Sequence, residues 1–368
     1  MLWLAVKNLY EENARLLITI GGVAFSVVLI VLIWGLYNGF GNSVSVYLDT
    51  WEADLIVSQK GSADLSHSIS LLPADVEGEL AGINGISSVT PFISRLVAFE
   101  VNGNMANLRL VGYKAGERKG GPVAIASGRD ILQQGEIVVD RVFAKNHGVT
   151  IGDELTIQSH VLRTVGISTG GNFFAYQYGF VDKSEARDMF QQETFNNFYL
   201  VKLRSDSNLE EISGRIEAIP GVQAVSRDSF IDLNQRLVKQ SFLPIVFVLV
   251  VVASIIGIAV IALTIYTSTI NKSRAFGVLK ALGASNLQLY RMVLFQALVS
   301  GLLGYIVGVV AGLLATRLII ELVPSFVSQM GPMNLMVILV LSIFMSALAS
   351  YAPVRKLLSL DPAVVFRA

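Results

Sequence analysis

The sequence predicts an α-helical membrane protein with four transmembrane helices and one α+β domain outside the membrane. Of its 368 residues, 53% are hydrophobic and 15% are charged, and the mean hydropathy is +0.59. An ordinary soluble domain carries about a quarter charged residues. The deficit is concentrated in four apolar stretches, and a polar region of ordinary composition lies between the first two. This distribution is typical of a membrane protein with one folded aqueous domain.

Each predicted span is long enough to cross the hydrocarbon core of a bilayer, which takes about 20 apolar residues in a helix. The four spans cover residues 16–40, 243–270, 291–322 and 335–352. The first could instead be a secretory signal peptide, whose apolar core has about 7–15 residues before a small-residue cleavage site. The stretch is longer than that and has no such site, so we expect a retained helix.

Basic residues predict how these spans are oriented, because Lys and Arg are enriched in cytoplasmic loops. The segment between the second and third spans has four basic residues and no acidic one, and the tail at residues 353–368 has three. The link between the third and fourth spans has none. We therefore expect a multi-pass protein of the inner or plasma membrane, with both termini cytoplasmic and residues 41–240 outside.

The first 15 residues, before the first span, form a predicted interfacial helix on the cytoplasmic side. Their apolar side chains can share one helical face, which suits a helix lying in the plane of the interface. This face comprises Leu2, Trp3, Val6, Leu9 and Tyr10. The alternative is that these residues simply begin the first long helix.

The outer region is predicted to contain two lobes. One is built from both ends, residues 41–111 and 193–240, where a strand, helix and strand pattern occurs twice. Leu80–Val89 (LAGINGISSV) aligns with Ile216–Val225 (IEAIPGVQAV), and glycine is a natural helix stop in both. A pair of βαβ halves is the economical interpretation, although coincidence remains open for a match this short. The other lobe, residues 112–192, is an insertion rich in predicted strands and turns.

Several kinds of chemistry are missing from the sequence. No GxxxxGK[ST] loop occurs to bind nucleotide phosphates, and there is no cysteine. The three histidines, His67, His147 and His160, have no metal-ligand spacing. No Asp, Glu, Lys or His lies at the middle of a span, which argues against a carrier driven by an ion gradient. We therefore expect no catalytic residues, no metal and no cofactor bound by this chain, and the formal net charge of zero gives no case for nucleic acid.

The loop at residues 271–290 is too regular for a simple linker. Phe276, Leu279 and Leu282 are apolar at helical spacing among basic residues. The Gly283–Asn286 stretch then provides a helix stop and a new N-cap. The pattern predicts a short amphipathic helix that docks a cytoplasmic partner. An interfacial helix with no special role is the competing interpretation.

Four motifs resemble one known family over essentially the whole chain. They are ADLIVSQKG after the first span, GRDILQQGEIVVD with GVTIGDELTI in the inserted lobe, FGVLKALGAS between the second and third spans, and DPAVVFRA at the end. Together with the order of one span, outer domain and three spans, they resemble the FtsX/MacB-type (type VII) permeases of ABC transporters. The chain departs at Ala275-Phe276, where family members often carry an acidic residue.

The resemblance implies that the short inner helix seats on an ATPase and couples its closure to the outer domain. By match, the coupling residues are Arg274, Phe276, Gly277, Leu279, Lys280, Leu282 and Gly283. It also implies that the first lobe is porter-like and that the permease is a homodimer. A separate ATPase chain in two copies would bind ATP and Mg²⁺. A periplasmic adaptor and an outer-membrane channel are further candidate partners.

Small residues recur where helices are expected to pack closely. Gly304, Gly308 and Gly312 repeat every four residues in the third span, and we expect them to pack within one subunit. In the family, the dimer core is built largely by the first two spans. The resemblance therefore makes another set the better dimer candidates, namely Gly21, Gly22, Gly35, Ser254 and Gly257.

The outer ends of the spans are apolar and aromatic, which suggests a hydrophobic or amphipathic substrate such as heme, a lipid or a drug-like molecule. The candidate contacts are Tyr37, Phe40, Phe242, Met330 and Met333, with either methionine able to serve as an axial heme ligand. These residues could instead simply face lipid. The predicted function is an ABC exporter permease that resembles the heme-efflux and heterocyst-glycolipid-export branches. The alternative is a subunit that transmits force to an extracytoplasmic partner, such as a cell-wall hydrolase, without transport.

Overall fold

The computed structural model describes residues 13–65, 68–114, 119–131, 133–173, 176–191 and 194–358. Residues 1–12 of the predicted interfacial helix and most of the tail lie outside these ranges, and residues 13–15 belong to the first long helix. The chain divides into two compact units. A helical unit takes residues up to Asn38, Phe242–Leu322 and Ser328 onward, and an α+β unit takes Gly39–Ser241 with Val323–Val327.

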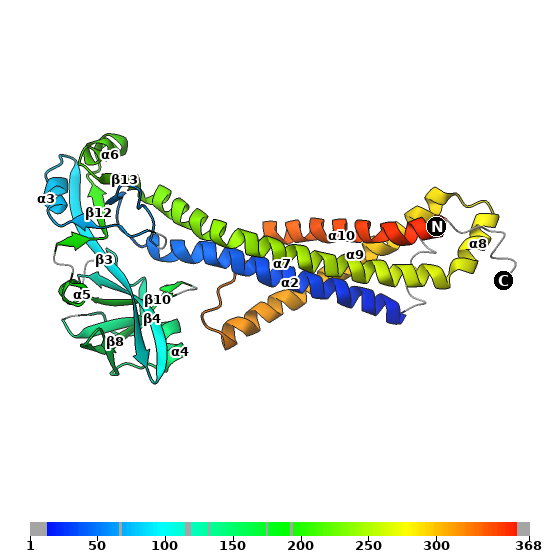
Figure 1. Cartoon of the computed structure of the whole chain (residues 1–368), viewed down its shortest axis with the longest axis horizontal. Helices are drawn as coiled ribbons and strands as arrows, with labels where there is room; N and C mark the ends of the chain where they lie inside the picture. The colour runs from blue at the N-terminus through cyan, green and yellow to red at the C-terminus, as the bar shows by residue number, and fades with distance from the viewer. Residues whose placement is uncertain are drawn as a thin grey trace. The chain divides into compact units, whose positions relative to one another are not determined.

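The helical unit contains the four long helices expected from the apolar stretches (Figure 1). They are α2 (Asn13–Leu48), α7 (Arg227–Asn271), α9 (Asn286–Leu322) and α10 (Pro332–Leu358). All four are long and apolar enough to cross a membrane. The predicted spans were shorter at several ends, because they stopped where apolar composition stops. The helical backbone continues further, and the unit boundaries fall inside α2 and α7.

Glycines of α9 allow it to pack tightly against α2. An added Cβ atom at Gly304 would stand 2.5 Å from Val23 Cβ, and one at Gly308 would stand 2.6 Å from Val27 Cβ. At Gly312 it would stand 2.9 Å from Val31 Cγ1. Three glycines and three valines, each repeating every four residues, therefore form one continuous contact between two helices of the same chain.

The first lobe of the α+β unit is an antiparallel sheet in the order β13-β1-β12-β3, which is the strand order of a ferredoxin-like βαββαβ fold. Its elements are β1 (Leu55–Gln59), α3 (Val76–Ala81), β3 (Ile86–Val101), β12 (Phe198–Leu203), α6 (Leu209–Glu217) and β13 (Val222–Ser226). Two short strands, β2 (Leu72–Pro73) and β11 (Phe195–Asn196), pair beside it. The buried side chains of α3 and α6 pack with those of β1, β12 and β13 in one core.

The two βαβ halves repeat the same turn between helix and strand. Gly85 and Gly221 both have positive φ, at +102° and +79°. In each turn the amide of the next residue donates to a carbonyl three residues earlier, Ile86 N to Ile83 O and Val222 N to Ile219 O, both at 3.2 Å. The sequence match between the halves therefore corresponds to a shared local geometry.

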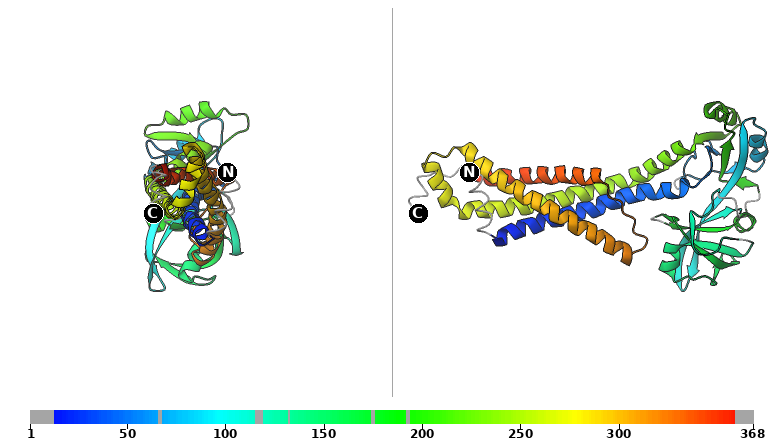
Figure 2. Two further views of the ribbon diagram at one scale, coloured as in Figure 1. Left: turned by 90° about the vertical axis from the view of Figure 1, so that its right-hand side faces the viewer. Right: turned by 180° about the vertical axis from the view of Figure 1, so that it is seen from behind.

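The inserted lobe begins inside β3, earlier than the predicted start at residue 112. The first half of β3 pairs with β12, and its second half, from Ile93, pairs with β4 (Figure 1). The sheet continues in the order β4-β10-β6-β8-β5. Its elements are β4 (Asn104–Tyr113), β5 (Ala124–Gly128), β6 (Glu136–Asp140), α4 (Arg141–His147), β7 (Glu154–Ile157), β8 (His160–Thr169), β9 (Asn172–Phe173), β10 (Tyr176–Asp182) and α5 (Lys183–Phe190). Figure 2 shows the same strand from behind, running through both parts of the sheet.

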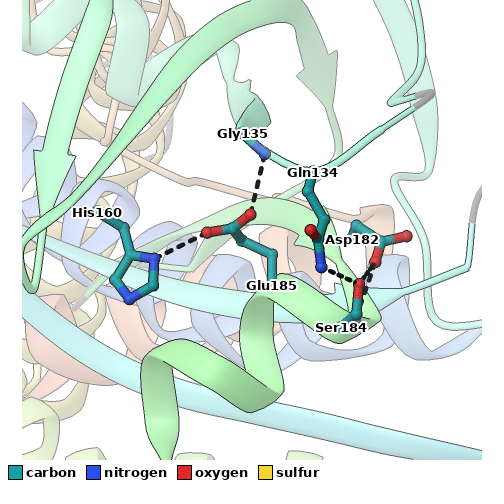
Figure 3. Close-up of polar contacts among 6 residues, drawn as sticks. All are labelled: Gln134, Gly135, His160, Asp182, Ser184 and Glu185. Carbon is teal, nitrogen blue, oxygen red and sulfur yellow. Dashed lines mark hydrogen bonds and ion pairs between the residues drawn. The ribbon is translucent and has the colours of Figure 1, made fainter.

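Polar contacts of α5 join it to two other segments of the inserted lobe (Figure 3). Glu185 accepts from Gly135 N at 2.9 Å and lies 2.9 Å from His160 Nδ1. Beside it, Gln134 Nε2 donates to Ser184 Oγ at 2.6 Å. These bonds give His160 a structural partner. Within the described residues, no group of three or more His, Cys, Asp or Glu could hold a metal ion.

Candidate functional site

The loop between α7 and α9 folds into the short helix α8 (Ser273–Ala281). Its end has the two hydrogen bonds of a Schellman motif. Ala284 N donates to Leu279 O at 3.0 Å, and Gly283 N donates to Lys280 O at 3.1 Å. Gly283 has φ +96°, which a residue with a Cβ atom adopts only with strain. Gly283, the second glycine of the FGVLKALGAS motif, therefore ends the helix and turns the chain toward α9.

The next helix begins with a reciprocal capping box. Gln288 N donates to Ser285 Oγ at 3.3 Å, and Ser285 N donates to Gln288 Oε1 at 2.9 Å. The two bonds join Ser285 and Gln288 in both directions, and Gln288 N also donates to Ser285 O at 3.0 Å. The turn between α8 and α9 is thus fixed at both ends by its own sequence.

Replacing Ser285 with alanine should loosen this turn. The loss of an N-cap side chain costs about 1 kcal/mol, so the first turn of α9 should exchange its amide hydrogens faster while the α+β unit is unaffected. Hydrogen exchange of residues 286–289 measures the effect. Ser285→Asp, which keeps a capping oxygen, is the matched control and should retain most of the protection. Equal protection in Ser285→Ala and the unmodified chain would contradict the assignment.

One face of α8 packs into the helical unit. Phe276 is 5% exposed and shares a buried cluster with Leu289, Met292 and Val293 of α9. Gly277 is also buried, and Leu279 is half-buried against the same cluster. Of the predicted coupling residues, Phe276, Gly277 and Leu279 therefore lie on the face of α8 that packs against the helical unit, and not on its exposed face.

The opposite face of α8 is exposed and largely apolar. Arg274 is exposed, Val278 is 43% exposed and Leu282 is 80% exposed. Leu287, at the start of α9, is exposed as well. We call Arg274, Val278, Leu282 and Leu287 the α8 surface. Lys280 is half-buried, and Gly283 is exposed in the turn.

Sequence reasoning missed Val278 and Leu287. The predicted apolar stripe contains Phe276, Leu279 and Leu282, but these three do not share one environment, since Leu282 is exposed. Val278 and Leu282 are four residues apart in the sequence, and this spacing indicates a second apolar face on the same helix.

Most of the residues predicted for a dimer core have neighbours within the same chain. An added Cβ atom would collide with Val260 at Gly22, with Ser328 at Gly35, and with Met345 and Ser26 at Gly257. Ser254 donates from its Oγ to Val250 O at 2.7 Å within α7. Gly21 differs, because nothing lies within 4 Å of the position that its Cβ atom would take.

The five predicted substrate contacts do not share one environment. Phe40 is buried and belongs to the α+β unit, whereas the others belong to the helical unit. Met333 is exposed. Tyr37, Phe242 and Met330 are half-buried, with the Tyr37 ring 6.0 Å from that of Trp34. Met330 packs against the core of the helical unit.

Known proteins resemble both parts of the chain. A family model described as MacB-like periplasmic core domain matches residues 16–219, and one described as FtsX-like permease C-terminal matches residues 247–362. An uncharacterized ABC transporter permease of Mycobacterium bovis is 24% identical over 369 residues, which cover 100% of this chain and 99% of the relative. One of Mycobacterium tuberculosis is 24% identical over 373 residues, with the same coverage.

Two solved structures are also similar in part. The periplasmic region of MacB from Actinobacillus actinomycetemcomitans matches with a TM-score of 0.39 and 14% identity, over 50% of this chain and 94% of that one. The extracellular domain of the noncanonic ABC-type transporter YknZ from Gram-positive bacteria matches with a TM-score of 0.37 and 10% identity, over 47% and 99%. Because the MacB-like family model alone spans more than half of its residues, the chain belongs to the FtsX/MacB-type family of ABC transporter permeases.

Proposed function

We propose that this chain is the permease subunit of an ABC exporter and that α8 receives the motion of a separate ATPase. Membership of the permease family implies an ATPase partner. The single observation that carries the assignment to α8 is its exposed apolar surface, held by a buried anchor and two fixed turns between membrane helices. Val278 and Leu282 supply the apolar contact, and Arg274 supplies a charge that can pair with an acidic groove.

The proposed orientation places α8 and both termini in the cytoplasm and the α+β unit outside. Three Lys and Arg residues without an acidic residue lie between α7 and α9, and Arg291 follows near the start of α9. Basic residues of such loops are retained on the cytoplasmic side. This orientation brings the α8 surface to the side where ATP is available. We expect ATP and Mg²⁺ to be held by the ATPase, and we assign no cofactor to the permease itself.

The buried polar side chains of the helical unit favour transport driven by a separate ATPase over transport driven by an ion gradient. Its fully buried polar side chains, among the described residues, are serines and threonines of α2, α7, α9 and α10, with no ionisable group among them. Ion-coupled carriers place ionisable side chains within their helices. The absence of buried ionisable side chains from the described part of this unit is consistent with energy supplied by ATP hydrolysis and transmitted through α8.

We also propose that two copies of the permease assemble with two ATPases. Gly21 lies between Leu17 and Phe25 at four-residue spacing, and these two apolar side chains are exposed. A small residue between two large ones allows a second helix to approach closely in lipid. Replacing Gly21 should therefore weaken the dimer without disturbing contacts within the subunit.

A hydrophobic or amphipathic substrate, such as heme, a lipid or a drug-like molecule, is the substrate class that we propose. Purified permease and the ABC ATPase that co-purifies with it from native membranes, reconstituted together, test the function. ATP hydrolysis and transport are measured with a panel of heme, lipids, macrolides and peptides. Export requires that one of these stimulates hydrolysis and crosses the membrane. Hydrolysis that responds only to an extracytoplasmic protein would identify a force-transmitting subunit, and no association with an ATPase would refute both.

A further inference from the structure

A cavity of about 590 Å³ lies in the α+β unit, between the loop after β1 and the strands β3, β4 and β12. Its apolar lining residues are Leu65, Ile69, Leu71, Leu96 and Phe198, and its polar ones include Ser94, Arg109 and Asn197. The volume falls within the range of about 300–1,000 Å³ that small-molecule sites occupy. Its lining includes no residue of α8 and none of the five predicted substrate contacts.

Strand register explains why Arg109 lines the cavity. Leu96 of β3 lies directly opposite Arg109 of β4, so the two side chains share one face of the sheet. Arg109 Nη1 donates to Ser94 Oγ at 3.5 Å, and its guanidinium lies 4.5 Å from the centre of the Tyr176 ring. The cation is therefore held in place by an aromatic ring on the neighbouring strand β10.

Arg109 has hydrogen-bonding capacity left over. Its Nε is buried, and no residue that the structure describes accepts a hydrogen bond from it. A buried donor without a partner costs about 1–3 kcal/mol, more when the group is charged. Because guanidinium pairs best with the oxygens of carboxylate and phosphate, the position of Arg109 in the cavity lining points to an anionic group.

The loop that covers the cavity is anchored at both ends. At one end, Gln59 N donates to Ser70 Oγ at 2.9 Å, and Asn197 Nδ2 donates to Ser70 O at 3.1 Å. At the other, Leu65 N donates to Asn234 Oδ1 at 2.8 Å. Leu65 and Ser70 are thus held in place before binding, which lowers the ordering cost of a bound ligand.

The rim of the cavity is apolar and open to solvent. Ile69 is 76% exposed, and Leu71 and Leu96 are exposed beside it. Large apolar side chains that are exposed around a cavity indicate a surface that a bound ligand covers. We propose that this cavity binds an amphiphile whose single anionic headgroup, carboxylate or phosphate, pairs with Arg109 while its apolar chain covers Ile69 and Leu96.

Asp64 lines the cavity from the loop after β1, and its hydrogen bonds indicate whether the ligand also needs a positive charge. Its carboxylate accepts from Ser68 N at 3.1 Å and from Ser68 Oγ at 2.5 Å. These bonds engage the carboxylate with its own loop, so it does not require a cationic ligand. A ligand with only an anionic headgroup, held at the Arg109 end, therefore fits better than a zwitterion. This inference goes beyond the proposed function, because binding here needs neither the ATPase nor transport.

Photolabelling of the full chain in phosphatidylcholine nanodiscs tests the proposal. The probe is a 12-carbon fatty acid with a diazirine at the end of its chain, and labelled peptides are located by mass spectrometry. We expect labels within residues 64–71 and 94–109. Arg109→Gln should lower labelling about tenfold, as expected for a lost charge-assisted hydrogen bond. Arg109→Lys should lower it less, because the charge remains.

Matched variants protect the test against a simple loss of folding. Ile69→Ser should reduce labelling, whereas Met105→Ser, an equally exposed apolar residue of β4 outside the cavity lining, should not. Sodium dodecanoate and dodecyl phosphate serve as competitors, and the stronger of the two identifies the headgroup. Competition by dodecanol at equal strength, competition by inorganic phosphate alone, or full labelling of Arg109→Gln would each overturn the proposal.

Discussion

Replacing Val278 and Leu282 with aspartate should uncouple the permease from its ATPase. Both side chains are exposed in the isolated chain and would be buried by a docked partner. Burying an aliphatic side chain contributes about 1.5–3 kcal/mol, and an aspartate in its place would leave a desolvated charge. We expect each change to lower ATPase affinity at least about tenfold, and the double variant to lose permease-dependent ATP hydrolysis. Co-purification and steady-state hydrolysis are the measurements.

Two controls separate docking from folding. Val161→Asp makes the same chemical change at an exposed residue of β8 in the α+β unit and should leave ATPase binding unchanged. Phe276→Ala, by contrast, removes the buried anchor of α8 and should lower the melting temperature. If the α8 surface variants bind and stimulate the ATPase as the unmodified chain does, α8 is an interfacial helix with no coupling role.

Enlarging Gly308 should strongly destabilise the helical unit. A Cβ atom there would meet Val27 Cβ at 2.6 Å and the backbone oxygen of Ala24 at 2.8 Å, so the helices must separate. Overpacking of this kind costs about 3 kcal/mol, and leucine adds a larger side chain at the same point. We expect Gly308→Leu to lower the melting temperature of the detergent-solubilised monomer by several degrees or to prevent its purification.

Gly21→Leu is the matched control for this substitution, since it adds the same atoms to a glycine of α2 that has free space around it. It should leave the monomer as stable as before and shift the equilibrium from dimer toward monomer. Size-exclusion chromatography with light scattering reads the second effect. Equal melting temperatures for Gly308→Leu and the unmodified chain would show that the α2–α9 contact is not tightly packed.

Local sequence patterns predicted much of the fold. The strand, helix and strand pattern that occurs twice in the sequence forms β1, α3 and β3, and β12, α6 and β13. The helices end at Ala81 and Glu217, before the predicted stops at Gly85 and Gly221, and these glycines instead have positive φ in the turns that follow. β3 extends to Val101 and pairs in both lobes, which the predicted lobe boundary at residue 112 does not show. Its second half pairs with β4 across the local Asn102-Gly103 turn, whereas its first half pairs with β12, which is distant in sequence. The local pattern does not show where one partner replaces the other.

The candidate coupling site was only partly predictable for a similar reason. The sequence identifies a short helix with a glycine stop, and both occur as α8 and Gly283. Which face points outward depends on how α8 rotates against α9, and burial of Phe276 beside Met292 and Val293 determines that rotation. Both faces carry apolar residues, so periodicity alone could not tell the anchor from the exposed surface.

Site-specific crosslinking from Leu282 tests the central claim most directly. The sequence contains no cysteine, so Leu282→Cys introduces a single thiol that can carry a benzophenone maleimide. With the co-purifying ATPase present, we expect this position to crosslink to the ATPase, and Val161→Cys in the α+β unit to give no such product. A crosslink from Val161→Cys but not from Leu282→Cys, or none from either in a complex that hydrolyses ATP, would contradict the proposal that α8 receives the motion of the ATPase.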